Sequence, residues 1–268
     1  MSRARNFARG FLALVFAASL FAAWLAPVSY EVQFREAPNA APSAAHPLGT
    51  DELGRDLLSR ILYGSQVSLW LAPAAALIAT LLAAVIGGVA GWLGGWWERL
   101  ALAATDLSLS LPWLFLLLTV RAILPLNVPA WSSVLITFAL LGVLGWSQAA
   151  RVLCAGARSL RHSEFVLHAR ASGAFGARLF FRQILPNLKP VLAAQFLISI
   201  PIFILTEANL GMLGLGVAEP LPSWGNLLRS LESGPHIVQN PWRLAPLVLL
   251  VLVVSSFQLL LPREEFAS

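Results

Sequence analysis

Several runs of about 20 residues carry no charged side chain, and these runs restrict the folds open to the chain. A helix of that length spans a hydrocarbon core of roughly 30 Å. Hydrophobic residues make up 58% of the 268 residues and charged residues 12%, which is roughly half the charged fraction of a soluble protein. We therefore expect an all-α, polytopic membrane bundle of about six transmembrane helices, with little room for a second soluble domain.

The predicted spans follow the apolar runs. Arg3, Arg5 and Arg9 precede the first run. A secretory signal peptide would look similar, but the run is long and no clear A-x-A site follows it, so we expect an uncleaved helix. The spans are predicted at roughly 10–28, 67–97, from 100 onward, 131–151, 191–210 and 244–261. This divides the chain into residues 1–66, a first transmembrane helix with an external amphipathic segment, and residues 67–268, a core of five helices.

The external segment is predicted to end in a short amphipathic helix that starts at Thr50 and lies along the outer membrane surface. Thr50 is a suitable N-cap residue, followed by two acids that favour the positive end of a helix. The expected ion pairs are Asp51 with Arg55, Glu52 with Arg55 and Asp56 with Arg60, and the expected apolar face is Leu57, Leu58, Ile61 and Leu62. In the second span, Gly87, Gly91 and Gly95 recur at four-residue steps, which predicts close approach of another helix.

The stretch 151–190 interrupts the apolar sequence with positive charge. It holds one acid, Glu164, and seven basic residues, which are Arg151, Arg158, Arg161, Arg170, Arg178, Arg182 and Lys189. Basic loops between membrane spans face the cytoplasm. With this loop inside, both ends of the chain lie in the cytoplasm, and the cytoplasmic segments hold 12 of the 18 Lys and Arg.

Within this stretch the residues predict two short helices. Ser163 can cap a helix that runs to about Ser172, and Gly173 then allows the chain to turn. A second helix is expected over residues 176–185, before Pro186. The pair would form a compact projection from the membrane, and an ordinary positive-inside loop remains the alternative.

Catalytic and metal sites are not expected. The only lysine, Lys189, lies in Asn-Leu-Lys-Pro, so no Walker A loop exists, and H-E-x-x-H and G-x-S-x-G are absent. Cys154 is the single cysteine, and the four histidines lack metal-ligand spacing within a span. Asp106, Arg121 and Glu207 fall near predicted span ends, which argues against a secondary transporter driven by ions. The energy for any transport would then come from another chain.

The basic stretch resembles the cytoplasmic loop of ABC importer permeases. That pattern is Glu-Ala-Ala, three residues, Gly, nine residues, Ile, one residue, Leu-Pro, and it fits when aligned on Gly173 and Leu185-Pro186. Leu167 and His168 replace the usual Glu and Ala, and Gln183 replaces Ile. The resemblance implies a coupling helix that docks into a groove of a separate ATPase. The implied coupling residues are Glu164, Ala169, Arg170, Gly173, Arg178, Leu185 and Pro186.

Two further stretches resemble the dipeptide/oligopeptide/nickel permeases, a family with the type I importer fold. They are HPLGTDELGRDLLSRILYGSQVSL, residues 46–69, and EANLGMLGLGVAEPLPSWGNLL, residues 207–228. The second implies an external gate or binding-protein contact in the loop 214–225, with Gly214, Gly216, Pro220, Trp224 and Gly225 as its candidates. The tail SSFQLLLPREEFAS departs from the family because it lacks the usual Gly-Asp and Arg-Asp.

The resemblance implies an importer in the bacterial inner membrane. Its expected partners are a second homologous permease, two cytoplasmic ABC ATPases, an external solute-binding protein and membrane lipid. The chain would bind no cofactor, its partners would use ATP, and the solutes would be small peptides or nickel chelates. The net charge of +5 is explained by orientation in the membrane, so no nucleic-acid partner is expected. An ATP-independent channel or secondary transporter, and a membrane scaffold, remain as alternatives.

Overall fold

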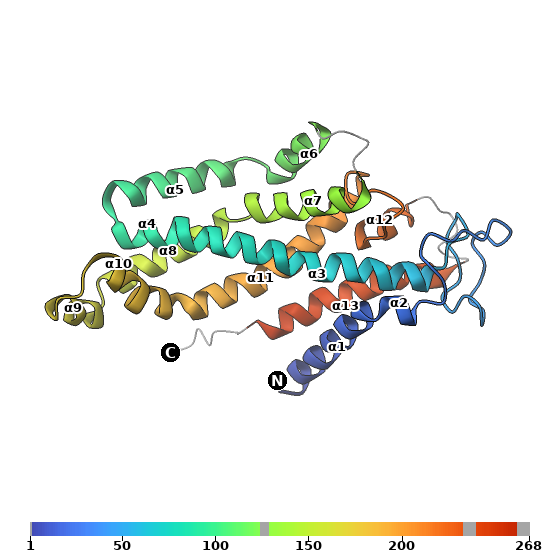
Figure 1. Ribbon diagram of the computed structural model, residues 1–268, viewed down its shortest axis with the longest axis horizontal. Coiled ribbons are helices and arrows are strands. Elements are labelled where there is room, and N and C mark those ends of the chain that lie inside the picture. The colour runs from blue at the N-terminus through green and yellow to red at the C-terminus, as the bar shows by residue number, and fades with distance from the viewer. Residues whose placement is uncertain (1, 124–128, 233–239, 262–268) are drawn as a thin grey trace. The chain divides into compact units, whose positions relative to one another are not determined.

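The computed structural model describes residues 2–123, 129–232 and 240–261 (Figure 1). Within these ranges the chain is helical with connecting segments and contains no β-strand, only two isolated bridges. The predicted all-α class is confirmed. The predicted carboxyl-terminal tail with Arg263 lies outside the described residues.

The helices group into two compact units that alternate along the sequence. Unit 1 comprises residues 1–73, 121–138 and 200–268, and unit 2 comprises residues 74–120 and 139–199. The predicted division at residue 66 stays a prediction. In order, the elements are α1 (Ser2–Leu20), α2 (Ala22–Leu25), α3 (Leu57–Ala83), the π-helix η1 (Ala84–Gly88), α4 (Val89–Leu93), α5 (Gly95–Ser110), α6 (Trp113–Ile123), α7 (Ala130–Leu144), α8 (Ser147–Arg161), α9 (Glu164–Ala171), α10 (Gly176–Leu179), the π-helix η2 (Phe180–Ile184), α11 (Leu185–Met212), α12 (Trp224–Arg229), the 3₁₀-helix η3 (Pro241–Leu244) and α13 (Ala245–Leu260).

Four helical stretches in the described part of the chain are long and apolar enough to cross a membrane. They are Leu57–Leu93, Ala130–Arg161, Gly176–Met212 and Pro241–Leu260. The other two predicted spans are interrupted helices, α1 with α2 and α5 with α6. The second interruption falls at Leu111, whose extended ψ of 130° is the conformation that a following proline imposes.

In unit 1, α1 and α13 lie side by side (Figure 1). The middle of α3 packs on α1 through Trp70, whose indole N–H donates to Ser19 Oγ at 3.1 Å. The Phe16 ring meets the Trp70 ring edge-on at 5.7 Å between centroids. Apolar and aromatic contacts therefore join these helices, with one hydrogen bond fixing their register.

Glycines in unit 2 bring η1 and α4 against α8, as the four-residue spacing predicts. A Cβ on Gly87 would lie 2.1 Å from Ala150 O, and one on Gly91 would lie 2.2 Å from Cys154 O. The prediction is wrong for Gly95, which has no atom within 4 Å of such a Cβ and is the first residue of α5, with φ of 61°. Two of the three glycines thus serve helix packing.

More of the basic stretch, residues 151–190, is helical than the sequence predicted. Its first part is helical, because α8 continues to Arg161, and its last part belongs to α11. The predicted stop before Pro186 is wrong, since α10, η2 and α11 follow one another without a break. Pro186 lacks the N–H that would bond to the carbonyl of Arg182. That carbonyl lies in the wider π turn η2, which accommodates the proline inside a continuous helix.

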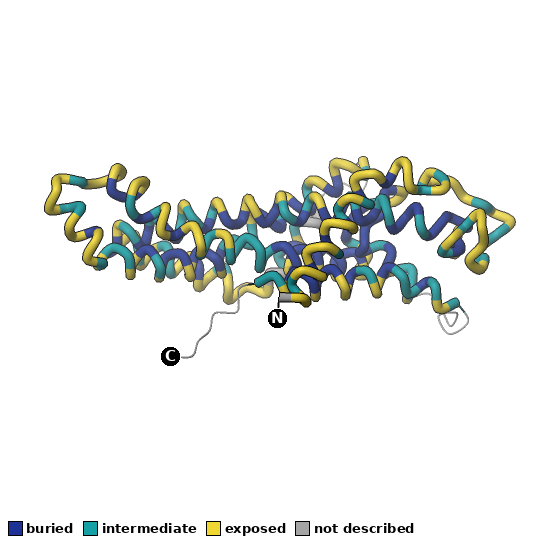
Figure 2. Tube along the Cα trace, turned by 90° about the horizontal axis from the view of Figure 1, so that it is seen from below, coloured by how far each residue is buried: buried dark blue, intermediate teal, exposed yellow. Residues whose placement is uncertain are grey.

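The remaining projection is small and mainly exposed. In Figure 2 the α9–α10 segment at the left end is coloured largely as exposed, with a few buried positions on its inner side. Val166 and Leu179 are buried and join a core cluster with Leu153, Ala157 and Ile184. This apolar anchor holds the projection on α8 and on the start of α11.

Candidate functional site

Residues 50–56 form a tight polar turn in place of the predicted amphipathic helix. The helix starts only at Leu57, where Asp56 is its N-cap: Asp56 Oδ1 accepts hydrogen bonds from Ser59 N and Ser59 Oγ, both at 2.7 Å. Asp56 Oδ2 lies 2.9 Å from His46 Nδ1. Since Asp56 is committed to the cap and to His46, the predicted pair with Arg60 does not form. The predicted helix from Thr50 is therefore wrong, and α3 runs from this cap directly into the second span.

Asp51 accepts hydrogen bonds from the side chains of two arginines, Arg55 and Arg60. Its Oδ2 accepts from Arg55 Nε at 2.8 Å and from Arg60 Nη1 at 3.0 Å. Its Oδ1 accepts from the backbone N–H of Leu53 and of Arg55, both at 2.9 Å. The predicted Asp51–Arg55 pair is confirmed, although in a turn. Asp51, Arg55 and Arg60 are all buried, so the charges are screened little by water.

Glu219 completes this arrangement from a distant part of the sequence. Its Oε2 accepts from Arg55 Nη1 at 2.7 Å and its Oε1 accepts from Arg60 Nη2 at 3.1 Å. We call Asp51, Arg55, Arg60 and Glu219 the arginine–carboxylate cluster. Its four formal charges cancel, which is the condition for burying arginines at tolerable cost. The cluster ties the 50–56 turn to the segment between α11 and α12.

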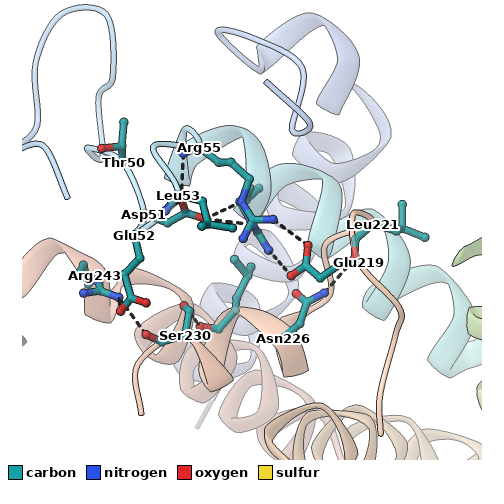
Figure 3. A network of polar contacts seen from close by, with 12 residues as sticks. Thr50, Asp51, Glu52, Leu53, Arg55, Glu219, Leu221, Asn226, Ser230 and Arg243 are labelled. Atoms are coloured by element: carbon teal, nitrogen blue, oxygen red, sulfur yellow. Dashed lines mark hydrogen bonds and ion pairs between the residues drawn. The ribbon is translucent and has the colours of Figure 1, made fainter. Parts of the chain in front are cut away.

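A second ion pair, between Arg243 and Glu52, involves the same 50–56 turn. Arg243 Nη2 donates to Glu52 Oε1 at 2.9 Å and to the Ser230 carbonyl at 2.8 Å (Figure 3). The predicted pairing of Glu52 with Arg55 is wrong, because the chain turns at residues 52–54 and Glu52 leaves the side on which Arg55 lies. The 3₁₀-helix η3, which precedes α13, is thereby linked to the same turn.

The helix α12 is seated in unit 1 by a buried polar contact. A capping box starts it: Asn226 N donates to Ser223 Oγ at 3.3 Å, and Ser223 N donates to Asn226 Oδ1 at 2.9 Å. The Trp224 backbone N–H donates to Ser68 Oγ, which donates to Glu207 Oε2, both at 3.2 Å. Glu207 is fully buried and lies near the end of α11 at Met212, as the sequence predicted.

The five predicted gate residues divide into exposed and buried positions. Gly214 and Pro220 are exposed, whereas Gly216, Trp224 and Gly225 are buried. A Cβ on Gly211 would lie 2.3 Å from Gly225 Cα, so α12 rests directly on α11. Their role as a gate or as a binding-protein contact stays a prediction.

The coupling candidates all lie in unit 2 and centre on a helix end at Gly173. Gly173 N donates to Arg170 O and Ala174 N donates to Ala169 O, both at 3.0 Å. With φ of 83° at Gly173, these two bonds make a Schellman motif. The predicted turn at Gly173 is confirmed. Ser163 does occupy the N-cap of α9, but its hydroxyl donates to Leu160 O and caps no N–H of α9.

Side chains around this turn separate into anchors and an exposed set. The Arg170 guanidinium lies 5.2 Å from the centre of the Trp92 ring, a cation–π contact, and Ala169 and Leu185 pack on the core cluster. Glu164, Arg178 and Pro186 are exposed. Four apolar side chains are exposed as well, namely Phe165, Leu167, Phe175 and Phe181. Phe180 and Ile184, from the same helical stretch as Phe181, are buried in the core cluster.

Sequence reasoning missed the contacts of three residues. These are Arg60, which binds Asp51, and the two acids Glu219 and Glu207. The Asp51–Arg60 spacing of nine residues fits no helical pairing rule, since only i,i+3 and i,i+4 neighbours meet. Glu219 lies in a Gly- and Pro-rich stretch without periodicity. Glu207 carried a usable signal, because an acid inside an apolar helix requires a polar partner.

Among described residues, no three His, Cys, Asp or Glu side chains come together in a metal-binding arrangement.

The sequence is similar to known transport proteins over most of its length. Residues 83–262 match the family described as binding-protein-dependent transport system inner membrane component. A protein of Brucella suis biovar 1 assigned as a peptide permease is 34% identical over 246 residues, covering 90% of this chain and 79% of the relative. The glutathione transport system permease protein GsiD of Salmonella typhimurium is 34% identical over 258 residues, covering 94% and 82%. GsiD of Escherichia coli O1:K1 is 32% identical over 255 residues, covering 93% and 80%.

Proposed function

This chain belongs to the family of inner membrane components of binding-protein-dependent transport systems and is a membrane permease subunit of an ABC importer, and we propose that it helps form the pathway for small peptides or related solutes such as nickel chelates. Relatives assigned to peptide and glutathione transport support the peptide class. The multi-pass helices agree with a place in the inner membrane.

The observation that carries the proposal is the α9–α10 projection, which we assign as the coupling element. Phe165, Leu167, Phe175 and Phe181 expose apolar surface at a helix pair that Val166 and Leu179 anchor from inside. Exposed apolar side chains gathered at a projecting element mark a protein contact. The exposed Arg178 and Arg182 add positive charge that would complement an acidic groove rim. Leu167, where related loops usually carry Glu, would meet the ATPase as an apolar contact.

The assembly that we propose contains a second homologous permease, two cytoplasmic ABC ATPases and an external solute-binding protein. Both ends of this chain then face the cytoplasm, in agreement with the excess of Lys and Arg in the segments assigned to that side. ATP binding would close the ATPases and move the projection, which shifts the permeases between inward- and outward-facing populations. This chain would hold no cofactor and perform no catalytic step of its own, since its partners would hydrolyse ATP.

We propose residues 214–225 as the external gate or as the contact for the binding protein. Gly214 and Pro220 are the exposed members that a partner could reach in this conformation. The buried Trp224 and Gly225 would instead transmit movement, because they rest on α3 and α11 through Ser68 and Gly211.

Photo-crosslinking in the assembled transporter tests the coupling assignment. A benzoylphenylalanine at Phe175 should capture the ATPase subunit, because this side chain is 69% exposed on the projection. The matched control is Leu107 of α5, in the same unit and 65% exposed, which should capture lipid or permease. Capture of the ATPase from position 107 and not from 175 would overturn the assignment.

A further inference from the structure

The two guanidinium groups of the arginine–carboxylate cluster converge on one carboxylate. Arg55 Nη1 and Arg60 Nη2 donate to the two different oxygens of Glu219. Each bond is charge-assisted, and a carboxylate held across both oxygens is fixed in orientation as well as position. The donors come from separate residues of the same short stretch, so the receiving geometry is built without any contribution from Glu219.

Asp51 keeps that geometry in place when Glu219 is removed. It binds Arg55 Nε and Arg60 Nη1, and two backbone N–H groups fix its own carboxylate. In addition, Arg60 Nε has no acceptor among the described residues although it is buried. Without Glu219, two buried arginines would face a single acid, and a buried unpaired positive charge attracts an anion strongly.

Glu219 is the member that solvent can reach. Its side chain is 51% exposed, against 2% for Arg60 and 9% for Arg55. It lies in the irregular segment between α11 and α12, next to the exposed Pro220. A competing carboxylate could therefore enter by replacing Glu219, while the arginines stay buried and anchored.

We propose that Arg55 and Arg60 form a carboxylate-binding site whose resident occupant is Glu219, and that the carboxylate of a transported solute displaces it. This inference rests on the proposed function, in which the solutes are peptides with a free carboxyl terminus. One carboxylate replaces another, so no buried charge is left unpaired during the exchange. Release of Glu219 frees the 214–225 segment from the 50–56 turn, which couples the arrival of solute to opening of the proposed gate.

Titration calorimetry of the purified full-length chain in detergent tests this site, with trialanine and trialanine amide as probes. In the natural chain the tethered Glu219 competes at an effective concentration on the order of millimolar, so both probes should bind weakly. In Glu219→Ala, trialanine should bind at least about tenfold more tightly than the amide and than it binds the natural chain, because two charge-assisted hydrogen bonds become available. Equal binding of both probes by Glu219→Ala, or binding of neither, would overturn the proposal.

Two further variants keep the test decisive. Glu219→Gln retains the shape and removes the charge, so it should also prefer trialanine to its amide, and it replaces the alanine variant if that chain fails to fold. Glu52→Ala removes the neighbouring carboxylate from Arg243 and should produce no gain in trialanine binding. A gain with Glu52→Ala equal to that with Glu219→Ala would show a non-specific charge effect and refute the site. Because the titration needs neither ATP nor an ATPase, its outcome is separate from that of the coupling experiment.

Discussion

Arg60 at the start of α3 and Glu219 before α12 are 159 residues apart in the sequence and are joined by a hydrogen bond of 3.1 Å from Nη2 to Oε1. Arg60 is also bound to Asp51, whose side-chain partners are all within the 50–60 stretch. The Arg60 guanidinium thus has one partner in its own stretch, Asp51, and one partner on a more exposed segment, Glu219. Because of this difference in exposure, the Arg60–Glu219 contact could be broken while the Arg60–Asp51 contact stays in place.

Asp51→Asn should destabilise the chain strongly. The substitution leaves Arg55 and Arg60 buried with only Glu219 as counter-ion, and breaking a buried pair in this way costs about 3–5 kcal/mol. The free energy of unfolding, measured with denaturant in detergent, checks this. Arg151→Gln is the control, since its pair with Asp106 is half-exposed and should change the unfolding free energy by about 0–1 kcal/mol. Equal losses for the two variants would contradict the burial argument.

Gly173→Pro should abolish ATP-dependent uptake and leave membrane insertion intact. Proline cannot adopt the φ of 83° and lacks the N–H that bonds to Arg170 O, so α9 would end differently. Gly173→Asn is the control because asparagine tolerates the left-handed conformation, and its uptake should stay near that of the natural chain. Normal uptake by the proline variant would mean that the turn is irrelevant to coupling.

This turn also shows where sequence reasoning succeeded. A short helix followed by glycine is a local pattern, and the turn between α9 and α10 at Gly173 could be predicted from it. The start of α3 was misplaced because Thr50 and Asp56 are both good N-cap residues, and contacts with His46 select Asp56. Glu219 could not be assigned, since its partners lie far away in the sequence and no periodic pattern connects them. The turn at Gly173 could be predicted from neighbouring residues, whereas the ion pairs of Glu219 with distant arginines could not.

Phe175→Ala should weaken association with the ATPase without lowering the stability of the chain. The side chain is largely exposed and contributes little to the core. Leu179→Ala is the opposite case, because Leu179 is buried in the core cluster and its truncation should cost about 2–5 kcal/mol. Co-purification of the ATPase and thermal unfolding distinguish the two effects. A Phe175→Ala chain that retains full ATPase association would remove this residue from the contact.

Gly91→Ala should loosen the packing of α4 on α8. Its Cβ would lie 2.2 Å from the Cys154 carbonyl oxygen, so the backbones must separate, at a cost of about 1–3 kcal/mol. Gly88→Ala is a control from the adjoining turn, because the nearest atoms to its Cβ are side-chain atoms 3.9 Å away, an ordinary contact. The free energy of unfolding in detergent should be clearly lower for Gly91→Ala than for Gly88→Ala. The reverse order would contradict the assigned packing.

Uptake into proteoliposomes tests the central claim most directly. Vesicles would contain this chain with its partner permease, the ATPases and the binding protein, and labelled trialanine would be supplied outside. Trialanine should accumulate only when the ATPases are assembled with the permeases and are supplied with ATP, and the permeases alone should give no accumulation. Uptake of the same size by this chain without ATPases or ATP would contradict it and identify the protein as a channel or secondary transporter.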